Sequence, residues 1–195
     1  MDLVLIVFGG AFLLVVIGLV LFIISIYNKL IRLGADCDNG WAQIDVQLKR
    51  RYDLIPNLVE TVKGYASHEK ETLDAVISAR AKAVQTHDAS DQGAKAMGRA
   101  EGELTQALGR LMVVAEQYPD LKANQNFAQL QEELTSTENK IGFARQHFND
   151  CVARFEVGRT TFPSNVISGM FNFKEREYFE LEDPGAREAP AVSFG

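Results

Sequence analysis

The sequence predicts an all-α protein, with an N-terminal transmembrane helix followed by an antiparallel up-and-down four-helix bundle with long first and fourth helices. Three observations support this prediction. Residues Leu3–Tyr27 contain no charged side chain, and about 20 apolar residues suffice to cross a bilayer. Apolar residues then recur at steps of three and four, which is the period of an amphipathic helix. Only five prolines and an apolar fraction of 47% indicate an ordered chain.

The apolar run predicts an uncleaved membrane anchor over residues 1–28. A signal peptide would have positive charge before a shorter apolar core and a small-residue cleavage site after it. Here Met1-Asp2 precedes the run. Lys29 and Arg32 follow it, whereas no lysine or arginine comes before it. The positive-inside rule therefore predicts an N-terminus outside the cell and a cytoplasmic bundle domain over residues 29–181.

The first soluble helix is predicted to extend to about Tyr65. Pro56 has no amide hydrogen for the carbonyl of Tyr52, so we expect a kink near Asp53. Weak helix formers gather between Gly34 and Gly40, which favours a joint between anchor and bundle there. The apolar stripe of this helix is Cys37, Trp41, Ile44, Leu48, Tyr52, Ile55, Val59, Val62 and Ala66.

Three further helices are expected before residue 160. The second covers about His68–Gln85, the third follows the turn Thr86–Gln92 and ends at Tyr118, and the fourth covers about Leu121–Val157. Short connections make neighbouring helices antiparallel, so the fourth should return beside the first. A short helix containing Val166 and Met170 is expected next, and the composition of residues 182–195 predicts a disordered tail.

Small residues form one face of the third helix, which we identify as a candidate helix-contact face. Glycine inside a helix costs up to about 1 kcal/mol relative to alanine, so such a row indicates that another segment comes close. That segment could belong to the same chain or to a second subunit. The residues of this face are Ala94, Gly98, Gly102, Thr105 and Gly109.

The return of the fourth helix places the residues that follow it near the lipid interface. Phe171, Phe173, Tyr178 and Phe179 are therefore candidate membrane-interface aromatics. Alternatively, they fold back and close the open end of the bundle. The same topology brings Cys37 and Cys151 to similar heights, where a disulfide is an option only in an oxidising compartment.

The polar side of the first soluble helix is a candidate interaction surface. Its strongest charge is Lys49-Arg50-Arg51, which lies on the order of 30 Å beyond Tyr27 in a straight helix, too far for direct steering by lipid. Pairing with acids such as Glu132 or Glu133, or with another subunit, is favoured instead. Carboxylates of the later helices are expected on solvated faces. The surface comprises Asp45, Lys49, Arg50, Arg51, Asp53 and Asn57.

The chain resembles the LemA family from the anchor to Glu180. The most specific match is Gln43–Tyr65, and Phe162-Pro163-Ser164-Asn165 and Tyr178-Phe179-Glu180 support it. The resemblance implies a bacterial membrane protein with one N-terminal span, its N-terminus outside, and a four-helix bundle. It implies no particular enzymatic activity, although some relatives are associated with magnetosome membrane formation. Phe148 and Phe155 stand where relatives often carry tyrosine, which weakens any role for hydroxyls there.

No catalytic, cofactor-binding or metal-binding set is recognisable in the sequence. His68-Glu69 begins like a zinc-protease motif, but Thr72 replaces the second histidine. The net charge of -6 disfavours nucleic acid as a partner, and no small-molecule substrate is indicated.

We therefore expect a non-enzymatic, self-assembling scaffold or interaction protein in the bacterial inner membrane. Its partners would be the lipid bilayer and further copies of itself, with another membrane protein as an alternative. Two alternatives stay open: an accessory or regulatory subunit of a membrane protease or envelope-stress system, and a membrane-shaping protein.

Overall fold

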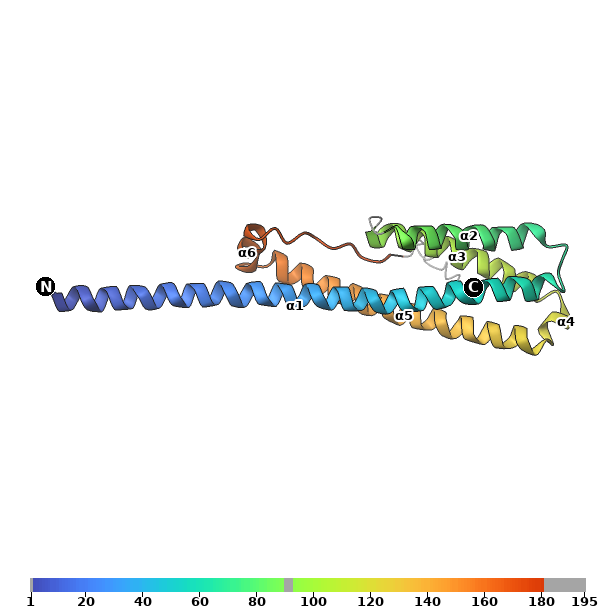
Figure 1. The fold of residues 1–195 in the computed structure, drawn as a ribbon, viewed down its shortest axis with the longest axis horizontal. Coiled ribbons are helices and arrows are strands. Elements are labelled where there is room, and N and C mark those ends of the chain that lie inside the picture. The colour runs from blue at the N-terminus through green and yellow to red at the C-terminus, as the bar shows by residue number, and fades with distance from the viewer. Residues whose placement is uncertain (1, 90–92, 181–195) are drawn as a thin grey trace, which may run out of the picture. The chain divides into compact units, whose positions relative to one another are not determined.

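The computed structural model describes residues 2–89 and 93–180. Every regular element in these ranges is a helix, which confirms the predicted all-α class. The tail predicted at 182–195 lies outside the described residues. The helices are α1 (Asp2–Lys63), α2 (Lys70–Asp88), α3 (Gly93–Ala115), α4 (Pro119–Lys122), α5 (Gln125–Thr160) and α6 (Ser164–Met170) (Figure 1).

Helix α1 contains both the predicted anchor and the predicted first soluble helix. Its N-terminal part is long and apolar enough to cross a membrane, by length and composition. Large apolar side chains there, including Phe12 and Leu14, are about 70% exposed. Apolar surface of this extent has no favourable place in water, so the observation fits a lipid environment for this part of α1.

The chain divides into two compact units. Unit one comprises Met1–Gly40 and Asn149–Arg176, and unit two comprises Trp41–Phe148 and Glu177–Gly195. Helices α1 and α5 therefore contribute residues to both units. The division of α1 falls at the end of the weak Gly34–Gly40 patch, but α1 is helical throughout this patch. The expected joint is thus a boundary between units and not an interruption of the helix.

Helix α1 also continues through Pro56. Proline removes the hydrogen bond to the carbonyl four residues earlier, which here belongs to Tyr52. In unit two, Nε of Arg80 on α2 donates a 2.8 Å hydrogen bond to that carbonyl. The side chain from α2 replaces the missing donor.

The predicted apolar stripe forms the buried side of α1 as far as Val62, and its last member, Ala66, follows the helix. Trp41 is half-buried, and every other member from Cys37 to Ala66 is buried. Within unit two, the buried apolar residues also include Val76 on α2, Leu104 on α3 and Ile141 on α5.

The third and fourth predicted helices differ from the structure at their junction. Helix α3 ends at Ala115, and Pro119 begins the short α4. The predicted fourth helix is thus divided into α4 and α5. Asn124 separates them, and its side-chain oxygen accepts a 3.0 Å hydrogen bond from the amide of Phe127 at the start of α5. An asparagine in this position satisfies an otherwise unpaired helix donor, which explains the break.

In unit one, α6 packs against α1. Ile26, Leu30 and Ile167 form a small buried cluster, with Ile23 and Phe173 against it. Cys37 and Cys151 are both buried in this unit and are not joined in a disulfide.

Candidate interaction surface

Arg51 lies inside unit two, where it connects three helices. Its side chain is only 2% exposed, and the Glu101 side chain of α3 is 1% exposed. Nη1 of Arg51 donates to Glu101 at 3.1 Å, and Nη2 lies 2.8 Å from Thr105 Oγ1 and 3.1 Å from Glu138 on α5. The hydroxyl of Tyr52 donates to the other oxygen of Glu101. Arg51 is therefore part of the core and does not belong to the exposed contact surface on which the sequence placed it.

The buried network changes the acidity of its members. Burial raises the pKa of the Glu101 carboxyl above its usual 4.5, while Arg51 and the hydrogen bond from Tyr52 oppose the shift. Burial, together with the charge of Glu101, also raises the pKa of Tyr52. The burial of Glu101 contradicts the expectation that the carboxylates of the later helices lie on solvated faces. A buried charge is tolerated only when it is paired and hydrogen-bonded, which Arg51 and Tyr52 accomplish here.

The other polar residues of the predicted surface lie at or near the exterior of unit two. Lys49 pairs with Asp45 at 2.9 Å, and Asp45 also accepts a hydrogen bond from Nε2 of His87 on α2. Burial alone would raise the pKa of Asp45, but the hydrogen bonds from Lys49 and His87 outweigh it and lower that pKa. Asp53 and Asn57 are exposed.

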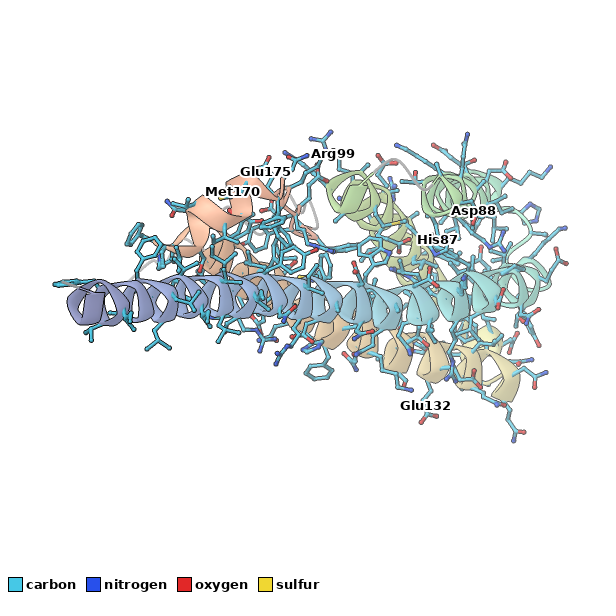
Figure 2. All side chains as sticks on the ribbon, turned by 60° about the vertical axis from the view of Figure 1, so that its left-hand side comes forward. His87, Asp88, Arg99, Glu132, Met170 and Glu175 are labelled. Atoms are coloured by element: carbon cyan, nitrogen blue, oxygen red, sulfur yellow. The ribbon has the colours of Figure 1, made fainter. Side chains whose placement is uncertain are left out.

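Arg50 is half-exposed and lies 3.7 Å from Glu133 on α5. Glu133 is one of the two acids that the sequence suggested for this cluster. The other, Glu132, points away from the helices (Figure 2).

The small-residue face of α3 contacts two other segments of unit two. Thr105 bonds to Arg51 of α1, and Ala94 and Gly102 are buried. At Gly98, a Cβ atom would overlap the backbone carbonyl of Glu180. Gly109 is exposed, and a Cβ atom there would meet nothing within 4 Å. Most of the predicted contact face is therefore occupied by the same chain.

The segment Glu177–Glu180, which we call the C-terminal strap, lies along α3. The carboxylate of Glu177 accepts a 3.3 Å hydrogen bond from the amide of Lys95 in the first turn of α3. An acid in this place pairs with donors that the helix itself leaves unsatisfied. Phe179 is 1% exposed and packs 5.9 Å from the ring of Trp41. The strap thus closes part of the core of unit two.

The four candidate interface aromatics divide between the two units. In unit one, Phe171 and Phe173 pack edge-on against Tyr27, with ring centroids 4.8 and 5.6 Å away. Phe171 remains half-exposed. In unit two, Phe179 is buried and Tyr178 is 40% exposed. The buried position of Phe179 excludes it from contact with lipid in this conformation.

An exposed apolar patch lies beside a groove of unit two. Phe143 on α5 is 73% exposed and Val46 on α1 is 60% exposed. The groove holds about 690 Å³, and Ala42, Gln47 and Ala144 also line it. Large apolar side chains grouped on an otherwise polar surface are typical of contact sites.

The sequence matches the model of the LemA family over residues 40–194. The chain belongs to the LemA family. The match begins at Gly40, so it covers all of unit two that the structure describes and the α5–α6 part of unit one.

Curated relatives of this LemA-family chain include magnetosome proteins. It is 26% identical over 194 residues to magnetosome protein MamQ 2 of Paramagnetospirillum magneticum, which covers 87% of this chain and 71% of the relative. Identity to magnetosome protein MamQ of Magnetospirillum gryphiswaldense is 27%, with the same coverage. Protein LemA of Metamycoplasma hominis is 25% identical over 173 residues, covering 88% of this chain and 77% of the relative. The apolar part of α1 and these relatives fit a membrane-associated helical protein.

The sequence missed the buried network of this LemA-family chain because Arg51 lies beside charged residues that are exposed. A signal was nevertheless present on α3. Glu101 shares one face with Gly98, Gly102 and Thr105, and small neighbours leave room for a guanidinium group. A charged residue within a row of small residues on a helix is thus a usable indication of a buried ion pair.

Proposed function

We propose that this LemA-family chain is a single-pass membrane protein that acts through assembly and protein contact, without catalysis. In this proposal residues 1–28 anchor the chain in the bacterial inner membrane. Lys29 and Arg32 keep the following residues in the cytoplasm, as the positive-inside rule favours. The four long helical segments α1, α2, α3 and α5 would form a four-helix bundle.

One observation carries the proposal: the helix that contains the candidate span is also a central element of unit two. Arg51 of α1 bonds to α3 and α5, while Arg80 of α2 bonds to the α1 backbone. The contacts of these two arginines therefore hold helices of unit two together. A buried ion pair of this kind suits a structural role and leaves recognition to the exterior.

The patch of Phe143 and Val46 is the surface we assign to self-assembly. Copies anchored by the same span in one membrane share one orientation, so equivalent surfaces of unit two can face one another. Phe143 of one copy can then meet Phe143 of a second copy around a two-fold axis, as in an isologous contact. Burial of two phenyl rings and the flanking valines would remove the largest exposed apolar side chain of α5 from water.

Native mass spectrometry of the full chain, released from nanodiscs, tests this proposal. We expect oligomers for the wild-type chain and a shift towards monomers for Phe143→Ser and Val46→Ser. Val113→Ser on α3 is the matched control, because Val113 is 64% exposed but lies outside the groove. Its oligomer distribution should equal that of the wild type.

Strictly monomeric wild-type protein at every concentration would overturn the assembly role. Equal effects of Val46→Ser and Val113→Ser would exclude the groove as the contact. Recovery of a different protein in stoichiometric amount, in place of self-assembly, would support the accessory-subunit alternative.

A further inference from the structure

Unit one contains a second groove, where α1 leaves the apolar run. It holds about 650 Å³ and lies between α1, the last turns of α5 and the α5–α6 connection. Its walls combine apolar groups with cationic and hydroxyl side chains. These walls include Lys29, Arg154, Val157, Thr161, Phe162 and Ser164.

The position of the groove along α1 is fixed by contacts within unit one. Ile167 of α6 packs on Ile26 and Leu30, and Ile26 lies inside the uncharged run of α1. Lys29 is the first charged residue after that run, about 3 Å along the helix from Tyr27 at 1.5 Å per residue. The polar headgroup layer extends roughly 5–8 Å beyond the hydrocarbon. If α1 crosses the bilayer, the groove therefore lies at the level of lipid phosphates.

The exposed residues of α6 include two large apolar side chains. Val166 and Met170 on α6 are 53% and 69% exposed, and Phe162 before it is 78% exposed. Figure 2 shows Met170 on this short helix. A short element with an apolar outer side beside a membrane span is typical of segments that lie in the interface plane.

The cationic groups of the groove are available to an anion. Lys29 is exposed and makes no ion pair with any described residue. Arg154 is also exposed, while hydrogen bonds to the carbonyl of Asp150 and to the sulfur of Cys151 hold its guanidinium on α5. Val157 and Phe162 provide apolar contact for acyl chains beside these charges. The combination of two cations with an apolar wall matches an amphiphile with an anionic head.

We propose that this groove binds the headgroup of an anionic phospholipid, such as phosphatidylglycerol, from the bilayer that α1 crosses. Lys29 and Arg154 contact the phosphate, Ser164 offers a hydroxyl donor, and Phe162 packs on the lipid chains. The site is distinct from the Phe143 patch and does not depend on self-assembly.

Lipid titration of the full chain in detergent, followed by native mass spectrometry, measures this binding. Phosphatidylglycerol is compared with phosphatidylcholine of the same acyl chains. We expect preferential retention of phosphatidylglycerol, with a loss of about fivefold in affinity for each of Lys29→Gln and Arg154→Gln. Millimolar inorganic phosphate should not displace the lipid, because it lacks the apolar part.

Arg32→Gln is the matched control, because Arg32 follows the span one turn after Lys29 and does not line the groove. It should keep the full lipid preference. Equal loss in Arg32→Gln and Lys29→Gln would overturn the proposal in favour of general juxtamembrane charge. Absence of any preference in the wild type, or displacement by inorganic phosphate, would also overturn it. Thermal unfolding of each variant verifies that unit one remains folded. Phe162→Ser keeps both cations and removes an apolar contact, so it should weaken the binding of both phosphatidylglycerol and phosphatidylcholine.

Discussion

Arg51 of α1 and Glu101 of α3 form a 3.1 Å ion pair in which both side chains are almost completely buried. Such a pair contributes little to the stability of the folded protein when it is compared with apolar residues of the same shape in the same place. Removal of one partner is costly, however, because the other charge stays buried without compensation. This asymmetry leads to the first two predictions.

Arg51→Met should destabilise the protein by about 3–5 kcal/mol, because it leaves the Glu101 carboxylate in the core with Tyr52 as its remaining partner. Arg50→Met is the neighbouring control. Arg50 is half-exposed at 3.7 Å from Glu133, and surface pairs contribute about 0–1 kcal/mol. Chemical unfolding of the full chain in detergent micelles, followed by circular dichroism, measures both. Equal losses of unfolding free energy in Arg51→Met and Arg50→Met would contradict the burial of the Arg51–Glu101 pair.

Stability should depend on pH through Glu101. Because burial raises the pKa of this carboxyl above its usual 4.5, the folded state binds more protons than the unfolded state just above pH 4.5. The free energy of unfolding therefore falls as pH rises through that window. Glu101→Gln removes this titration, so the wild-type minus variant difference should decrease with pH. A difference that increases with pH would show that the Arg51 charge outweighs burial.

The hydrogen bond from Arg80 to the Tyr52 carbonyl should be coupled to Pro56. Arg80→Met leaves that carbonyl without a donor, at a cost of about 1–3 kcal/mol. In a Pro56→Ala background the alanine amide can donate to the carbonyl, so Arg80→Met should cost less. A double-mutant cycle by thermal unfolding measures the coupling. Lys82→Met, which removes an exposed pair with Glu103, should be additive with Pro56→Ala.

Two glycines of α3 should respond oppositely to alanine. Gly98→Ala places a methyl group against the Glu180 carbonyl and should displace the C-terminal strap, with lower stability and faster proteolysis near Phe179. Gly109→Ala meets nothing within 4 Å and should stabilise the helix by about 0.5–1 kcal/mol. Limited proteolysis and unfolding temperature report both effects. Stabilisation by Gly98→Ala would exclude the strap contact in solution.

Much of the fold was predictable because helical periodicity is a local property. The stripe from Cys37 to Ala66 identified the buried side of α1, and the charge-free run identified the candidate span. Two details depended on other segments. The donor that replaces the missing amide of Pro56 comes from Arg80, which lies far along the sequence. The division of the fourth helix depends on Asn124, whose capping role competes with the apolar period.

The candidate site was predictable only in part. The exposure of Lys49 and Asp53 could be predicted from their positions on the polar side of the helix. The burial of Arg51 could not be inferred from α1 alone, because its partners are on α3 and α5. Likewise, the sequence grouped Phe171 with Phe179 by proximity along the chain, whereas a change of unit at Arg176 separates their surroundings.

The contact of Trp41 with Phe179 has a consequence for the order of events during synthesis. Trp41 begins unit two, and Phe179 comes from the C-terminal strap far later in the sequence. Loop closure over such a separation is slow compared with helix formation. Phe148 packs 5.3 Å from the Trp41 ring, but the contact with Phe179 can form only after residue 179 has been synthesised. During that interval, the part of the core of unit two that Phe179 covers is open to chaperones and proteases.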